Sequence, residues 1–120
     1  MPDRGRLGRS LARWANTSEQ IDRDLRATHT GIGHTSLADA PDRERVRVQG
    51  RLRTVTLRPR GGVPALEAEL SDGTGSLIIV WLGRRRIVGV EPGRDLVVEG
   101  RIGVAHGART IFNPRYELLP

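Results

Sequence analysis

The sequence predicts an all-β protein, a small five-stranded barrel with a short helical extension at its N-terminus. Apolar and polar side chains alternate from Val46 onward, the pattern of strands that bury one face. Tight turns rich in glycine and proline separate these stretches. Apolar residues at helical spacing are confined to the first part of the chain. We therefore expect a helical, partly disordered extension over residues 1–45 and a barrel over residues 46–120.

The extension is expected to consist of short helical pieces. Leu7, Leu11 and Trp14 recur at helical spacing. Thr17, followed three residues later by a glutamine, matches a capping box, which would start a second helix at that point. Residues 30–33 contain two glycines and should end that helix. These pieces are weakly apolar, so they should pad one side of the barrel or leave roughly the first 15 residues disordered.

The first expected strand begins at Val46 and changes phase along its length. The apolar residues Val46 and Val48 occupy even-numbered positions, whereas the apolar residue Val55 further along occupies an odd-numbered one. An extra residue in one strand of an antiparallel pair produces such a slip. The sequence therefore predicts a β-bulge near Arg53 and Thr54.

The next two expected strands form a hairpin. A loop rich in proline and glycine over residues 58–64 leads into a strand over residues 65–70. A third strand follows over residues 76–82. The segment Asp72-Gly73-Thr74-Gly75 joins the two, because its glycines can adopt the positive φ angles of a tight turn.

The last two strands are expected over residues 95–104 and 109–118, the second interrupted at Pro114 and so an edge strand there. The connection over residues 84–93 is too short and too broken by glycine for a full helix. Five strands, a glycine within the first, and a connection between the third and fourth describe the OB-fold, a Greek-key barrel. An SH3-like barrel is the alternative, and the long first strand counts against it.

The charge of the chain indicates a polyanionic partner. The net charge is +6, and all 20 basic residues are arginine. Residues 46–120 hold twelve arginines and seven acidic residues, so most of the excess lies in the β-rich part. Arginine binds phosphate with two parallel hydrogen bonds and stacks on bases. Exclusive use of arginine also fits a G+C-rich genome, but the affinity for polyanions follows either way.

The sequence offers no catalytic residues and no metal site, and it implies no cofactor. His29, His34 and His106 are scattered, and the glycine-rich turns follow no phosphate-loop template. Without cysteine the chain can form neither a disulfide nor a Cys-based zinc site, which fits a reducing compartment. No apolar run approaches the roughly 20 residues of a membrane-spanning helix. We expect a non-enzymatic, cytoplasmic protein without a membrane partner.

Several motifs along the barrel resemble those of a known group of proteins. They are Val46-x-Val48-x-Gly50-x-Leu52, Pro64-x-Leu66, Asp72-Gly73-Thr74-Gly75-x-Leu77-x-Ile79, Pro92-Gly93-x-x-Leu96-x-Val98-x-Gly100 and Asn113-Pro114-x-Tyr116. Over residues 37–119 the chain resembles small stand-alone bacterial OB-fold nucleic-acid-binding proteins and the wedge domain of RecG-type branched-DNA helicases. It is more distantly similar to the anticodon-binding domains of class II aminoacyl-tRNA synthetases. The resemblance implies nucleic-acid binding but not branch migration, since no helicase motor or P-loop pattern is present.

The predicted nucleic-acid site combines arginines with two aromatic residues. Its members are Arg51, Arg53, Arg58, Arg60, Trp81, Arg84, Arg85, Arg86, Arg109 and Tyr116. The arginines would track phosphates, with single-stranded or branched DNA favoured over RNA, and the aromatic rings would offer stacking faces. The RecG resemblance places Trp81 and Tyr116 near the branch point. Trp81 shares its parity with Leu77 and Ile79, so burial in the core is the alternative for it. Partial burial in the core is also expected for Phe112 and is the alternative for Tyr116.

The third strand is apolar on both faces. Ile78, Val80 and Leu82 alternate with the core set, so the outward face needs a cover. The N-terminal helices are the expected cover, and a second subunit, another protein or stacked bases are the alternatives. The rival function is therefore a protein-interaction or oligomerisation module. Glu67 and Glu69 on the second strand would repel phosphate unless arginines pair with them.

Overall fold

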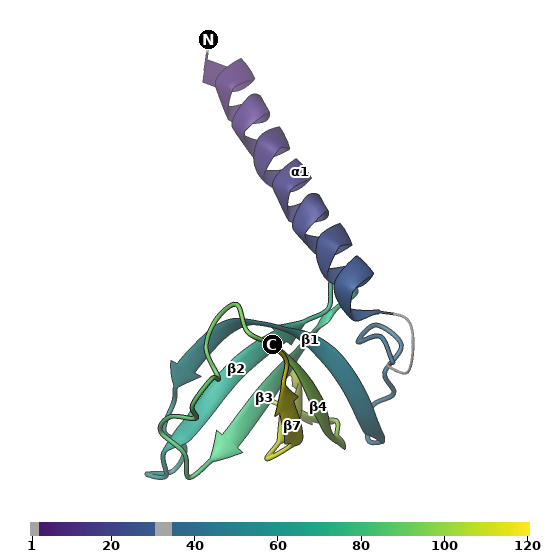
Figure 1. Ribbon diagram of the computed structural model, residues 1–120. Coiled ribbons are helices and arrows are strands. Elements are labelled where there is room, and N and C mark those ends of the chain that lie inside the picture. The colour runs from purple at the N-terminus through teal and green to yellow at the C-terminus, as the bar shows by residue number, and fades with distance from the viewer. Residues whose placement is uncertain (1–2, 31–34) are drawn as a thin grey trace.

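The computed structural model describes residues 3–30 and 35–120, with side chains from Ala15 onward. Within these residues one helix, α1 (Asp3–His29), precedes a single seven-stranded sheet. The strands are β1 (Arg45–Leu57), β2 (Ala65–Ser71), β3 (Ser76–Leu82), β4 (Asp95–Arg101), β5 (Gly103–Ala105), β6 (Ala108–Phe112) and β7 (Arg115–Leu118). Their order in the sheet is β5-β6-β3-β2-β1-β4-β7. Figure 1 shows α1 projecting from the curled sheet, with its C-terminal end against it.

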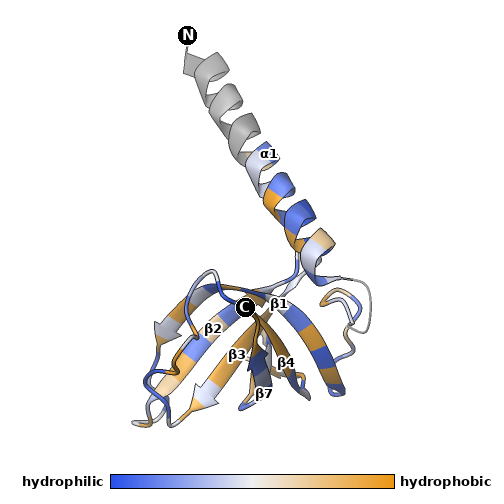
Figure 2. Ribbon diagram, in the orientation of Figure 1, coloured by the Kyte–Doolittle hydropathy of each residue, from blue (hydrophilic) through white to orange (hydrophobic). Residues whose placement is uncertain are grey.

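The first three strands form where the alternation predicted them. β1 pairs with β2, and the register shifts between Leu52 and Thr54, which confirms the bulge. β2 and β3 form an antiparallel hairpin that runs from the pair Ala65 and Leu82 to the pair Ser71 and Ser76. Hydrophilic and hydrophobic residues alternate along β1, whereas β3 is mainly hydrophobic (Figure 2).

The C-terminal part of the sheet is more broken than predicted. The expected strand over residues 95–104 divides at Ile102, whose N–H donates to the Glu44 carbonyl and whose carbonyl accepts from the Arg43 N–H. The expected final strand divides before Pro114 into β6, parallel to β3, and β7, antiparallel to β4. Seven strands in an order that does not close on itself leave the five-stranded barrel unconfirmed, whereas the mostly β architecture is confirmed.

The core lies on the inward face of the curled sheet and draws on the connections as well. Leu37 and Ala40 come from the segment between α1 and β1, and both are buried in the core. Ile87 and Val90 come from the connection between β3 and β4. That connection contains no helix, as predicted, and these two side chains fill the core in its place.

α1 is one continuous helix instead of the two short ones expected. Thr17 lies inside it, so the predicted helix start at that residue is wrong. Between Ala15 and Thr30, Leu25 and His29 are the buried side chains, and both lie near the C-terminal end, where α1 packs against β1. The helix therefore does not cover the outer face of β3, which corrects that expectation. The predictions for the side chains of residues 7–14 and for residues 31–34 lie outside the described residues.

Gly73 permits the closest approach between α1 and the β2–β3 hairpin. Its φ angle is +84°, and a Cβ atom there would lie 2.1 Å from the Asp22 carbonyl oxygen. The same atom would lie 2.9 Å from the Arg26 backbone nitrogen. A side chain at this position would push the helix off the hairpin, because backbone atoms cannot give way as a flexible side chain can.

Candidate nucleic-acid interface

The outer faces of β2 and β3 carry a continuous groove. It consists of two hollows of about 420 and 380 Å³ that share Arg58, Glu67 and Ile78 in their linings. The larger hollow lies between the β1–β2 loop, which contributes Arg60, and the β5–β6 turn, which contributes His106. In OB-folds the loops at these two places flank the ligand-binding face. We call the surface lined by these two hollows the groove.

Five of the ten predicted site residues are exposed arginines that form no ion pair with any described residue. They are Arg53, Arg58, Arg84, Arg85 and Arg86. Arg58 lines the groove, and Arg53 lines a smaller hollow beside the β2–β3 turn. The other three follow Gly83, whose N–H donates to the Pro64 carbonyl at 2.7 Å. This hydrogen bond holds the start of the triplet segment against the end of the β1–β2 loop.

Two predicted site arginines stabilise the fold instead. Arg51 donates from Nε and Nη2 to the two carboxylate oxygens of Asp95, at 2.7 and 3.1 Å. Arg109 donates from Nε to Asp42 at 2.8 Å and from Nη1 to the Leu37 carbonyl at 2.8 Å. Its Nη2 also donates to the Ala40 carbonyl. Because most of these donors are engaged within the protein, we expect both arginines to contribute less to phosphate binding than the unpaired arginines.

Trp81 is a core residue in the structure. Its side chain is 4% exposed, and its ring meets the Tyr116 ring edge-on, with centroids 5.7 Å apart. A base cannot stack on a buried ring, so the stacking role predicted for Trp81 does not fit this structure, and its parity with the core set was the better guide. Tyr116 is 40% exposed and keeps an accessible surface.

Phe112 is the exposed aromatic residue of the groove side, although it was expected to lie partly in the core. It is 41% exposed and pairs with Val80 across the parallel strands β3 and β6. The Arg60 guanidinium lies 5.5 Å from the Phe112 ring centroid, within cation–π range. Arg60 Nη2 also donates to Glu67 Oε2 at 3.4 Å. Strict alternation along β6, with Ile111 in the core, is the signal that would have placed Phe112 outward.

The outer face of β3 is thus covered at Val80 by neighbouring strands and the β1–β2 loop. Val80 lies between Glu67 on β2 and Phe112 on β6 and is fully buried. The contacts of Arg60 with both neighbours close the surface above it. Leu82, at the end of the strand, stays 40% exposed. The apolar patch predicted there is consequently smaller than its sequence suggests.

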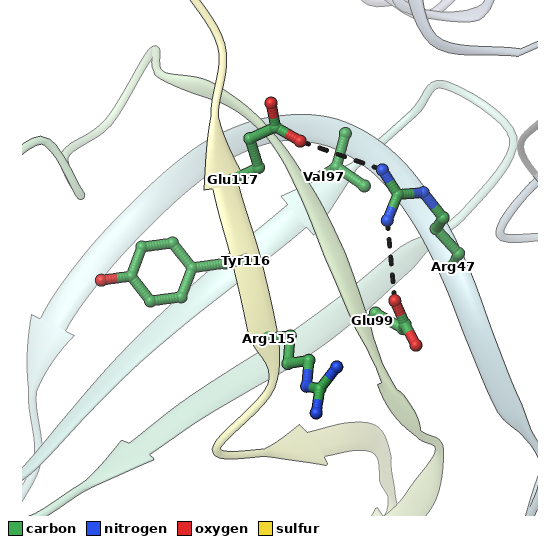
Figure 3. Close-up of a pocket in the computed structure, with 6 residues that line it drawn as sticks. All are labelled: Arg47, Val97, Glu99, Arg115, Tyr116 and Glu117. Atoms are coloured by element: carbon green, nitrogen blue, oxygen red, sulfur yellow. Dashed lines mark ion pairs between the residues drawn. The ribbon is translucent and has the colours of Figure 1, made fainter.

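A separate hollow, outside the groove, lies on the outer side of β1, β4 and β7 (Figure 3). Arg47 lies between two carboxylates there, 3.6 Å from Glu99 and 3.9 Å from Glu117. Two arginines and two glutamates line this hollow, Arg115 being the other arginine, so their charges cancel. Phosphate therefore finds less attraction here than at the unpaired arginines of the groove side.

His29 is buried where α1 meets the sheet. The Gln49 amide nitrogen lies 3.0 Å from its Nδ1, and Asp95 Oδ1 lies 3.3 Å from its Nε2. Burial lowers the pKa of His29, since the imidazolium loses its hydration there; Asp95 opposes this shift and Arg51 adds to it. Burial would raise the pKa of Asp95, but the Arg51 hydrogen bond and the His29 and Arg51 charges outweigh it and lower that pKa.

Acidification should weaken the attachment of α1 to the sheet. The pKa of His29 in the folded protein lies below its ordinary value of 6.5, so the unfolded chain takes up the proton first. The contribution of His29 to the free energy of unfolding should be fully present above about pH 6.5 and decrease as the pH falls through that value. The lowered pKa of Asp95 adds a further loss of stability below its ordinary value of 3.8. Urea denaturation at pH values on both sides of 6.5 measures this.

The variant His29→Gln should flatten the pH dependence around pH 6, because glutamine does not titrate. His106→Asn is the control, since His106 lies in the β5–β6 turn with a φ of +51°, which asparagine tolerates. A His29→Gln variant with the full pH dependence would assign the effect to another group.

Within the described residues, no helix combines the length and the apolar composition that crossing a membrane requires. No three acidic or histidine side chains of the described residues come together as metal ligands would. No family model and no curated protein matches the chain.

The solved structures that share the fold include the following two. The first is RecG bound to a three-way DNA junction, with 24% identity and a TM-score of 0.58 over 72% of this chain. This chain spans 12% of the RecG chain. The second is the solution structure of a replication factor A related protein from Methanobacterium thermoautotrophicum, with 13% identity and a TM-score of 0.54. That match covers 73% of this chain and 92% of the other. The OB-fold and the likeness to RecG that the sequence predicted are confirmed at the level of the fold.

Proposed function

We propose that this protein binds nucleic acid without catalysing a reaction, through the groove and the arginines beside it. The observation that carries the proposal is the set of exposed arginines that no described acidic residue neutralises, beside a groove at the ligand-binding face of the fold. Single-stranded or branched DNA is favoured over RNA, because RecG is bound to a DNA junction in the structure that this chain resembles. The bacterial origin, the cytoplasmic location and the division at residue 45 remain predictions.

The mechanism is electrostatic tracking of the backbone with limited stacking. Arg53, Arg58 and the Arg84–Arg86 triplet would bind phosphate oxygens, each guanidinium offering two parallel donors. Phe112 takes the stacking role that the sequence assigned to Trp81, since its ring is 41% exposed, and the 40% exposed Tyr116 keeps the role predicted for it. With so few exposed rings, most of the affinity should come from released counterions and depend strongly on salt.

Replacing Arg84, Arg85 and Arg86 together by alanine should weaken binding and reduce its salt dependence. Each lost phosphate contact on a single strand lowers the slope of log affinity against log salt by about 0.7, so three lost contacts lower it by about 2. Fluorescence anisotropy of a labelled single strand, titrated at several salt concentrations, measures the slope.

The matched control removes three arginines elsewhere. Arg23, Arg45 and Arg101 lie on α1 and at the far ends of β1 and β4. Their replacement by alanine changes the net charge equally but should leave most of the slope intact. An equal loss of slope in both triple variants would show that net charge alone acts. Absence of binding to single-stranded DNA, branched DNA and RNA at about 50 mM salt would contradict the proposed function.

The rival function, an oligomerisation or protein-interaction module, has less surface than the sequence suggested. Val80 is fully buried and Ile78 is half-buried, which leaves Leu82 as the exposed member of that patch. Light scattering separates the two functions: a monomer that binds nucleic acid supports the groove, and a stable oligomer without nucleic-acid affinity supports the rival.

A further inference from the structure

We propose that the larger hollow of the groove holds one unstacked nucleobase against Glu67 and favours a base that presents an amino group there, so that cytosine is bound in preference to thymine. This inference rests on the proposed function and specifies what the groove recognises. The observation that supports it is the position of the Glu67 carboxylate, which lines this hollow although the surrounding arginines suit a polyanion.

The larger hollow has the size and lining of a small-molecule site. Its volume of about 420 Å³ falls in the range of roughly 300–1,000 Å³ that such sites occupy. Ile78 and Thr110 line it from neighbouring strands, where they pair with each other. Ala105 and Ala108, on either side of the β5–β6 turn, have small side chains that leave room for a planar ring.

Glu67 is the hydrogen-bond acceptor that this hollow offers to a base edge. Its side chain is 19% exposed, and its contact with the other described residues is made through Oε2, to Arg60. Oε1 therefore remains available. A carboxylate repels phosphate but accepts strongly from an amino group, and glutamate is a known partner of the cytosine N4 amino group.

Arg60 makes this carboxylate compatible with a nucleic-acid strand. The guanidinium lies over the Phe112 ring and donates to Glu67 at the same time, so it is fixed from two sides. It thereby orients the carboxylate and compensates part of its charge. Exposed Arg58 lies on the same loop, where it can bind the phosphate of the nucleotide whose base enters the hollow.

Thymine and cytosine differ at the atom that would face Glu67. Cytosine presents the N4 amino group, which donates a hydrogen bond. Thymine presents the O4 oxygen, which is an acceptor, so it forms no hydrogen bond with the carboxylate and is repelled by it. The two bases are otherwise similar in size and stacking surface. We therefore expect oligo-dC to bind about tenfold more tightly than oligo-dT of the same length, as for one charge-assisted hydrogen bond in a partly exposed site.

Glu67→Gln tests the inference, because an amide of the same size can donate to O4 as well as accept from N4. The full chain and the variant are titrated with labelled oligo-dC and oligo-dT above pH 7, where cytosine is neutral. The preference for oligo-dC should fall from about tenfold to less than twofold. Glu69→Gln is the matched control: Glu69 lies on the same strand and the change in charge is identical, but Glu69 lines the 380 Å³ hollow of the groove and not the larger one. It should raise both affinities alike and preserve the preference.

Equal binding of the two oligonucleotides by the unaltered protein would overturn base selection while leaving nucleic-acid binding in place. A preference that persists in Glu67→Gln would overturn the role of Glu67. Absence of binding to both oligonucleotides, to branched DNA and to RNA in the unaltered protein would contradict the proposed function itself. Urea denaturation of each variant confirms that it folds. If Glu67→Gln does not fold, Glu67→Asp replaces it in the test, because its side chain is one methylene shorter and holds the carboxylate farther from the base.

Discussion

Replacing Asp72 by alanine should lower the free energy of unfolding by about 3–4 kcal/mol. The Asp72 side chain is buried and accepts four hydrogen bonds. Oδ2 accepts from the Leu37 N–H at 2.8 Å, and Oδ1 accepts from the Thr74 N–H at 2.9 Å, the Thr74 hydroxyl at 2.6 Å and the Gly75 N–H at 3.2 Å. Alanine would leave these donors unpaired, and it would detach the segment that carries Leu37 into the core from the hairpin.

Urea denaturation measures this loss. The control is Asp39→Ala, which removes an exposed carboxylate bonded to the Ser36 hydroxyl at 2.9 Å and should cost less than about 1 kcal/mol. Asp72→Asn keeps one acceptor oxygen and should fall between the two. An Asp72→Ala variant as stable as Asp39→Ala would show that this carboxylate does not hold the hairpin to the preceding segment.

Trp81→Ala should cost a similar amount, about 3–5 kcal/mol, because it empties a large volume in the core. The ring is among the buried core residues and contacts Tyr116 edge-on, so neighbouring side chains cannot fill the space fully. Trp81→Phe keeps most of the ring and should cost much less. It should also bind single-stranded DNA as the unaltered protein does, since a buried ring cannot stack on a base.

Phe112→Ala should give the opposite pattern. Phe112 is 41% exposed, so its removal should cost less stability than Trp81→Ala and should reduce affinity about fivefold or more, in line with about 1–3 kcal/mol per stacked base. Urea denaturation and anisotropy on the same preparations separate the two roles. Weakened binding in Trp81→Phe together with unchanged binding in Phe112→Ala would restore the stacking role to Trp81.

Local sequence patterns were enough to locate the first three strands, because the alternation of apolar and polar residues along a strand reflects which of its faces is buried. Alternation located β1, β2 and β3, and the phase slip located the bulge before Thr54. The capping box at Thr17 wrongly predicted the start of a second helix, because a local capping preference does not interrupt a helix that continues through it. The break at Ile102 was also missed, because it depends on hydrogen bonds to Arg43 and Glu44, far away in the sequence.

The candidate site was harder to predict for the same reason. Whether an arginine is free depends on partners that the fold supplies from a distance: Asp95 is 44 residues from Arg51, and Asp42 is 67 residues from Arg109. No periodicity contains that information. Arg84, Arg85 and Arg86 form no ion pair with any residue that the structure describes, and their role in binding stays a prediction.

The position of β1 between β2 and β4 has a consequence for how the protein folds. β1 meets β2 across a short loop, but it meets β4 only when a long stretch of chain has closed, as in the pairing of Arg51 with Asp95. The parallel pairing of β3 with β6 also brings distant segments together. Such a high contact order favours folding in milliseconds to seconds. Until β4 and β6 arrive, a β1–β2–β3 meander has two open edges, so refolding at high concentration competes with aggregation.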